Sequence, residues 1–137
     1  MKFIEDINIK NKRVLLRVDY NVPIQNGEIV NDYRILRSLK TIQYCLDSNA
    51  SVILMSHLGR PAGIKKEEFS LEPVLWHLED VIGQEIYFAD DCISQDAISI
   101  SEKLNPKEIL LLENLRFYNE ELENNHKFSE RLSKMGD

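Results

Sequence analysis

Residues Ser51–His57 have the sequence SVILMSH, four consecutive apolar side chains between polar ends. Three similar runs occur along the chain: Arg13–Asp19 (RVLLRVD), Glu85–Asp90 (EIYFAD) and Glu108–Asn114 (EILLLEN). None of the four shows a regular alternation of apolar and polar residues, which would indicate a strand with one wet face. Short continuous apolar runs are typical of strands buried on both faces, as in parallel sheets covered by helices. We therefore predict four parallel strands.

Apolar residues at helical spacing separate these runs. The first predicted helix begins at Asp32, with Asn31 as its N-cap, and the second lies between a Ser70 cap and Gly83. The third lies between a Ser94 cap and Asn105-Pro106. The last contains Phe128, Leu132 and Met135 and stops at Gly136. Parallel strands are joined by right-handed crossovers, so this order predicts an α/β fold, a three-layer doubly wound parallel sheet.

Composition narrows the function classes. The chain has 137 residues, 43% of them apolar and 29% charged, which is typical of one soluble folded unit. A net charge of -6 argues against a nucleic-acid or anionic membrane partner. No apolar run approaches the roughly 18 residues of a membrane helix, and no signal peptide is visible. Two isolated cysteines, Cys45 and Cys92, suit a reducing compartment, so we expect a cytoplasmic protein.

Polar side chains follow the carboxyl ends of the predicted strands, where open α/β sheets bind their ligands. They are Asp19 and Asn21 after the first strand, His57, Gly59 and Arg60 after the second, Asp90 and Asp91 after the third, and Arg116 after the fourth, with Arg34 in the first turn of the first helix. Three of the seven arginines therefore converge on one edge of the sheet.

These residue types suit a small anionic ligand. Arginine presents a fork of N–H donors that matches carboxylate and phosphate oxygens. Gly59 has no Cβ and lets the backbone approach an anion closely. Asp19 and Asn21 add an acceptor for a hydroxyl and a neutral donor–acceptor. We therefore expect a ligand that carries phosphate, carboxylate and hydroxyl groups.

Each residue also has a purely structural interpretation. Arg34 alone could be a solvated helix charge, His57 a hydrogen-bonded loop residue, and Asp19–Asn21 a turn. Their convergence on one edge favours a site. Trp76, His77 and His126 show no such convergence, and we predict that they lie on the surface.

Six short motifs resemble those of phosphoglycerate kinases, in the order and spacing of that family across essentially the whole chain. They are RVDYNVP (Arg17–Pro23), NDYRI (Asn31–Ile35), LMSHLGRP (Leu54–Pro61), SLEPV (Ser70–Val74), LLENLRF (Leu111–Phe117) and SKMGD (Ser133–Asp137).

The resemblance implies glycolytic phosphoryl transfer between 1,3-bisphosphoglycerate and ADP, which gives 3-phosphoglycerate and ATP. It implies that Asp19 and Asn21 bind the glycerate and that Arg34 is catalytic. It also implies that His57, Arg60 and Arg116 hold the phosphate that is not transferred. Such transfers depend on positioning and charge neutralisation, which agrees with an arginine in the catalytic role.

Other family features are missing from these residues. They include a strand with an NDAFG-type motif, a further arginine, and a second domain with its glycine-rich nucleotide site and magnesium-binding aspartate. We therefore expect residues 1–137 to be a partial N-terminal substrate-binding domain without the site for Mg-ATP or Mg-ADP, and to be inactive alone. The family strand order, 3-4-2-1-5-6, would leave the first strand at an edge. The family is monomeric, but we expect this chain to self-associate through that edge.

Two other interpretations remain open. One is a stand-alone, non-catalytic binding module for phosphorylated carboxylic acids, which differs in whether the reading frame continues past Asp137. The other is a doubly wound regulatory domain that is phosphorylated at the Asp90–Asp91 pair, which intact mass would detect. The six motifs favour the kinase family over both.

Overall fold

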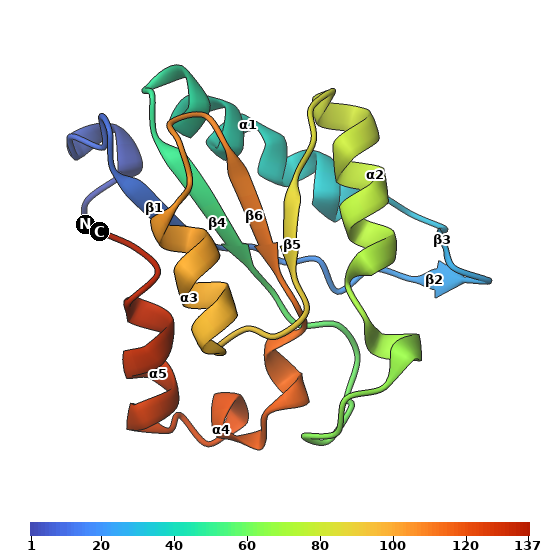
Figure 1. Cartoon of the computed structure of the whole chain (residues 1–137). Coiled ribbons are helices and arrows are strands. Elements are labelled where there is room, and N and C mark those ends of the chain that lie inside the picture. Colours follow the sequence, from blue (N-terminus) through green and yellow to red (C-terminus); the bar gives the residue numbers. More distant parts are fainter.

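A four-stranded parallel sheet forms the centre of the computed structural model, which describes residues 1–137 (Figure 1). Its strands are β1 (Arg13–Arg17), β4 (Ser51–Met55), β5 (Tyr87–Ala89) and β6 (Ile109–Leu112), in the order β1-β4-β6-β5. All neighbours in this sheet are parallel. The four predicted strands are confirmed, and so is the position of the first one at an edge.

The central strands explain the continuous apolar runs. Every residue of β6, and all of β4 except Met55, is buried. Successive side chains of a strand point to opposite faces, and the core divides accordingly. Val52, Leu54 and Leu111 pack in one apolar cluster, whereas Ile53 and Leu110 pack in the other. Both faces of these strands are therefore covered.

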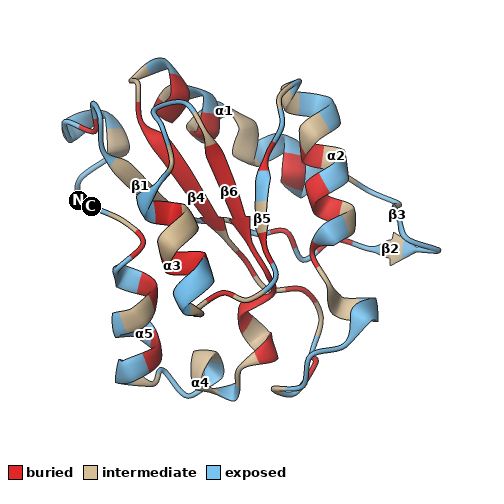
Figure 2. Ribbon diagram, viewed as in Figure 1, coloured by how far each residue is buried: buried red, intermediate tan, exposed pale blue.

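Helices form the two outer layers (Figures 1 and 2). α1 (Tyr33–Asp47) and α2 (Glu72–Ile82) contribute Ile42 and Leu78 to the first cluster. α3 (Gln95–Glu102) and α5 (His126–Ser133) contribute Ile98 and Phe128 to the second. The three-layer α/β architecture predicted from the sequence is confirmed. None of these helices is both long and apolar enough to cross a bilayer.

Two of the predicted helix starts differ from the structure by one residue each. α1 begins at Tyr33 with Asp32 as N-cap, and the side chain of Asn31 accepts a hydrogen bond from the Tyr33 N–H at 3.0 Å. α2 begins at Glu72, whose N–H donates to Ser70 Oγ at 3.2 Å. Asn31 and Ser70 therefore each accept a hydrogen bond from the first N–H group of a helix while lying just outside that helix.

Two other predicted boundaries are confirmed, the start of α3 and the end of α2, but the two remaining helix ends were predicted too late. α3 ends at Glu102, ahead of Asn105-Pro106, and α5 ends at Ser133, so Met135 and Gly136 lie beyond it. Ser94 is the N-cap of α3, where its side chain accepts from the Ala97 N–H at 3.0 Å. Gly83 ends α2 with a left-handed φ of 81°, a conformation that costs glycine little.

Several short elements were not predicted. β2 (Ile24–Gln25) and β3 (Glu28–Ile29) form a hairpin around Asn26-Gly27, where both residues have positive φ. A four-residue helix, α4 (Asn119–Leu122), and three 3-10 turns complete the chain; the turns are Ile4–Asp6, Glu67–Phe69 and Leu115–Phe117.

The last two residues lie against the outer edge of β1, near the start of the chain (Figure 1). The Asp137 N–H donates to the Arg13 carbonyl at 2.8 Å, and the Arg13 N–H donates to the Asp137 carboxylate at 2.8 Å. A Cβ on Gly136 would stand 2.8 Å from the Cβ of Leu15. The amino-terminal half of this edge is therefore covered, and the half toward Arg17 is not.

Candidate functional site

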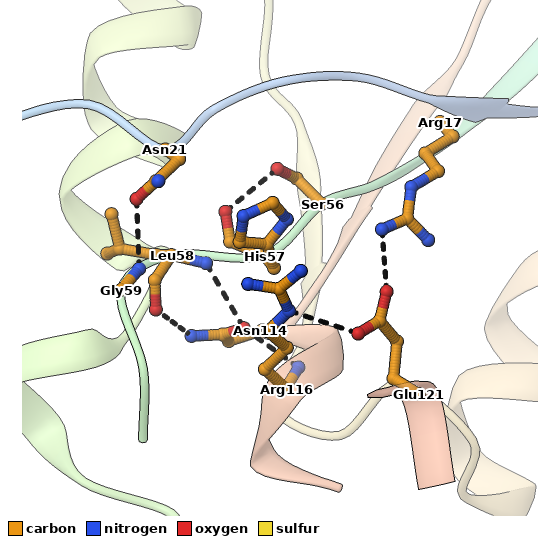
Figure 3. A network of polar contacts seen from close by, with 9 residues as sticks. All are labelled: Arg17, Asn21, Ser56, His57, Leu58, Gly59, Asn114, Arg116 and Glu121. Atoms are coloured by element: carbon orange, nitrogen blue, oxygen red, sulfur yellow. Dashed lines mark hydrogen bonds and ion pairs between the residues drawn. The ribbon is translucent and has the colours of Figure 1, made fainter. Parts of the chain in front are cut away.

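Three loops and the start of α1 meet at the carboxyl edge of the sheet. The loops follow β1, β4 and β6 and carry most of the predicted site residues (Figures 1 and 3). The first loop is held by Tyr20, which is fully buried and donates its N–H to Ser56 Oγ at 2.9 Å. Its hydroxyl lies 2.7 Å from Ser38 Oγ on α1. The loop after β1 is therefore fixed to its neighbours on both sides.

Asn21 and Gly59 connect the loops after β1 and β4. The Asn21 side-chain oxygen accepts a hydrogen bond from the Gly59 N–H at 2.9 Å. Gly59 has a φ of 63°, and a Cβ there would stand 2.5 Å from Phe69 Cε1. Both the backbone conformation and the lack of space require glycine at this position. The predicted close approach at Gly59 therefore occurs within the protein itself.

Asn114 connects the loops after β4 and β6. Its side chain is buried, accepts from the N–H groups of Leu58 (3.2 Å) and Arg116 (2.9 Å), and donates to the carbonyls of Leu58 (2.7 Å) and Phe69 (3.0 Å). All four hydrogen-bonding positions of one carboxamide are thereby used. This residue fixes the backbone that presents Arg116.

Arg34 lies in the first turn of α1 and reaches back to the loop after β1. Its Nη1 donates to the Asp19 carboxylate at 3.2 Å and to the Asn21 carbonyl at 2.8 Å. The side chain is half exposed. The guanidinium is therefore oriented while its other nitrogens face solvent.

Arg17, Arg116 and Glu121 form a second group of charges beside His57 (Figure 3). Glu121 accepts from Arg17 Nη2 at 2.6 Å and from Arg116 Nε at 3.1 Å. Burial lowers the pKa of His57, and the cations of Arg116 and Arg17 lower it further, while the Glu121 and Asp19 carboxylates oppose them. His57 is therefore a neutral imidazole at neutral pH.

Arg60 and the Asp90–Asp91 pair make no ion pair with this group of charges. Arg60 is exposed, and none of the salt bridges involves it. Asp91 accepts from the Tyr118 hydroxyl at 2.7 Å, and the Asp90 carbonyl accepts from Lys65 at 2.8 Å. The pair borders a separate hollow of about 230 Å³. The structure therefore brings Asp19, Asn21, Arg34, His57, Gly59 and Arg116 to one edge, with Asp90 and Asp91 beside it.

The residues predicted to lie outside the site do so. Trp76 and His126 are exposed on their helices. His77 pairs with Asp32 at 2.9 Å, which joins α2 to the start of α1.

Sequence reasoning missed Arg17 and Glu121. Arg17 ends β1 and carries a charge at the carboxyl edge, so its position could have indicated the site. Glu121 lies in the acidic run of α4, and only the tertiary structure brings it to the arginines. Beside Arg17, Asp19 and Arg34 lies an open hollow of about 690 Å³. No group of three or more histidine, cysteine, aspartate or glutamate side chains is arranged to hold a metal ion.

Comparison with known proteins gives consistent matches. A family model described as phosphoglycerate kinase matches residues 4–137. The phosphoglycerate kinase of Finegoldia magna is 51% identical over 99% of this chain and 35% of its own length. That of Elusimicrobium minutum is 47% identical over 100% of this chain and 34% of its own length.

Solved structures agree with these matches. The phosphoglycerate kinase of Coxiella burnetii superposes with a TM-score of 0.85 at 37% identity, over 98% of this chain and 33% of that one. The phosphoglycerate kinase of Pyrococcus horikoshii gives a TM-score of 0.87 at 33% identity, over 100% of this chain and 35% of that one. The chain thus spans about a third of the length of the relatives it matches.

Proposed function

The chain belongs to the phosphoglycerate kinase family, and we propose that residues 1–137 form the phosphoglycerate-binding part of such a kinase. The reaction is reversible phosphoryl transfer between 1,3-bisphosphoglycerate and ADP, which gives 3-phosphoglycerate and ATP. One observation carries the proposal: Arg34, Arg116, the neutral histidine and the Asp19–Asn21 loop lie together at the carboxyl edge of the sheet.

The glycerate end of the substrate is assigned to Asp19 and Asn21. One Asp19 oxygen is used by Arg34 and the Asn21 N–H, which leaves the other to accept from a hydroxyl. The Asn21 oxygen is used by Gly59, which leaves its amide N–H groups to donate to a carboxylate. These internal hydrogen bonds support the assignment, because they leave one atom or group of each side chain free for a ligand.

The phosphate that is not transferred is assigned to His57, Arg60 and Arg116. Arg116 uses Nε internally and keeps both terminal nitrogens, the edge that binds two phosphate oxygens at once. Neutral His57 supplies one N–H donor. Arg60 adds an exposed cation whose reach is set by the loop at Gly59.

Arg34 is assigned to the phosphoryl group that moves. Its contacts with Asp19 and Asn21 hold the guanidinium before substrate arrives, so less reorganisation is needed during transfer. Negative charge develops on the transferring oxygens, and a fixed cation stabilises that charge most in the transition state.

The nucleotide and Mg²⁺ are assigned to residues beyond these 137. The family uses nucleotide substrates, yet this part offers no cluster that fits a metal ion. Residues 1–137 are then a partial N-terminal domain that has no turnover alone. We place the protein in the cytoplasm, because both its cysteines are free and buried. We assign it no nucleic-acid or membrane partner.

The isolated chain is also proposed to self-associate through the open half of the β1 edge. Backbone groups of Val14 and Leu16 face β4, so those of Leu15 and Arg17 point outward. Gly136 lies against Leu15, which leaves the groups of Arg17 open. Asp137 covers only Arg13. An unpaired edge beside half-buried apolar side chains favours pairing with a second chain.

Titration calorimetry at low salt tests the binding proposal. We expect 3-phosphoglycerate to bind more tightly than sulfate, and Arg60→Ala or Arg116→Ala to abolish the difference. Lys103→Ala removes the same charge at the opposite edge of the sheet and serves as control. Equal binding of both anions by the wild-type chain would contradict the proposal.

A further inference from the structure

A nearly buried carboxylate lies between two arginines beside His57 (Figure 3). Glu121 comes from the short helix α4, and only 9% of its side chain is exposed. One of its oxygens accepts from Arg17 at 2.6 Å and the other accepts from Arg116 at 3.1 Å. The first arginine ends β1 and the second follows β6, so Glu121 joins residues 99 positions apart in sequence.

The carboxylate takes one side of the Arg116 guanidinium and leaves the other side open. It bonds Nε, whereas no hydrogen bond involves either terminal nitrogen. The open edge lies toward His57 (Figure 3). Glu121 therefore orients the fork without occupying the edge that would bind an anion.

The charge of Glu121 also matters. Burial would raise the pKa of its carboxyl, but the hydrogen bonds from Arg17 and Arg116 lower it below the ordinary value. The group is therefore ionised at neutral pH and cancels one of two neighbouring positive charges. A small inorganic anion meets a weaker field than the arginines alone would produce.

We propose that Glu121 is a specificity-determining positioning residue of the phosphate site. It orients the Arg116 guanidinium and lowers the positive electrostatic potential of the site. The site therefore favours a phosphate ester that is also held at a second point over a free inorganic anion. The affinity for an ester held at a second point depends on the orientation of the guanidinium, whereas the affinity for a free ion depends mainly on the net charge of the site. The identity of the ester rests on the function proposed above.

The first test replaces Glu121 with glutamine, which keeps the shape and removes the charge. The 137-residue chain is titrated with sulfate and followed by the ring signals of His57, assigned with His77→Gln and His126→Gln. We expect E121Q to bind sulfate about threefold to tenfold more tightly, the effect of one unit charge at partly screened short range. E123Q, an equal charge change at an exposed position, should change the affinity less than twofold.

A second readout in the same samples is the titration of His57. Glu121 raises the His57 pKa in the wild-type chain, so the pKa should fall further in E121Q and stay unchanged in E123Q. The ratio of 3-phosphoglycerate to sulfate affinity should also fall in E121Q. Unchanged sulfate affinity together with an unchanged His57 pKa would overturn the inference.

A further variant, E121D, keeps the charge and shortens the side chain. We expect sulfate affinity within twofold of wild type and at least about threefold weaker binding of 3-phosphoglycerate. A rise in sulfate affinity as large as that of E121Q would contradict the charge role. If the wild-type chain does not prefer 3-phosphoglycerate to sulfate, the proposed function fails, while the sulfate and His57 readouts still decide the role of Glu121.

Discussion

Replacing Asn114 with alanine should destabilise the protein more than any single change at the exposed part of the site. The carboxamide is 1% exposed and makes four hydrogen bonds, to two N–H groups and two carbonyls on three segments. A buried hydrogen bond contributes about 0.5–1.5 kcal/mol net, so four give roughly 2–6 kcal/mol. Water entering the space left by the side chain would satisfy some of the four groups. We therefore expect a loss of about 3 kcal/mol.

Urea unfolding followed by circular dichroism measures this loss, with the midpoint and slope fitted for each variant. Asn105→Ala is the matched control, because Asn105 is exposed and its side chain makes no hydrogen bond. Its change should stay within about 0.5 kcal/mol. Asn114→Asp keeps the acceptor but places a buried carboxylate against the Leu58 and Phe69 carbonyls, so it should destabilise the protein at least as much as Asn114→Ala. A loss under about 1 kcal/mol for Asn114→Ala would refute the view that this side chain holds the three segments together.

Four further outcomes are expected. Gly59→Ala should cost about 2 kcal/mol or more by urea unfolding, because its Cβ would stand 2.5 Å from Phe69 Cε1 in a left-handed backbone conformation; unchanged stability would contradict this. The His57 pKa is lowered in the folded state, so stability is unaffected well above the ordinary value of 6.5 and falls as pH drops below it. His57→Gln should flatten that dependence between about pH 7 and 5, and an equally steep profile would contradict it. In a full-length relative, replacing the residue that matches Arg34 should mainly lower kcat, whereas replacing the residue that matches Arg60 should mainly raise KM for the glycerate. Wild-type turnover without the arginine that matches Arg34 would remove the catalytic assignment. Leu16→Lys should shift the isolated chain toward monomer in light scattering across a concentration series, and a wild-type chain that is monomeric throughout would contradict association through β1.

The fold could be predicted because its central strands are buried on both faces. That burial produces the continuous runs around Val52–Leu54 and Ile109–Leu112, which have no other simple explanation. The helix starts were harder to place, because polar residues such as Ser70 take part in tertiary contacts. Ser70 donates its hydroxyl to buried Glu113 at 2.7 Å, in addition to accepting from the helix. The hairpin at Asn26-Gly27 was missed because two-residue strands leave little periodicity.

The site could be predicted where topology alone brings residues together. Asp19, Gly59 and Arg116 follow strand ends, and the carboxyl ends of parallel strands share one edge. Glu121 could not be found in this way, because an acidic residue in a polar segment looks solvated in sequence. Its role depends on the geometry of two arginines from distant strands.

Amide NMR mapping on the 137-residue chain shows whether the carboxyl edge of the sheet binds phosphoglycerate. On addition of 3-phosphoglycerate, we expect shift changes that saturate together at Asn21, Gly59 and Arg116. Sulfate should move mainly His57 and Arg116 and leave Asn21 unchanged, because it lacks the glycerate. Shifts confined to other surfaces, such as that around Trp76, or identical maps for both anions, would contradict the account.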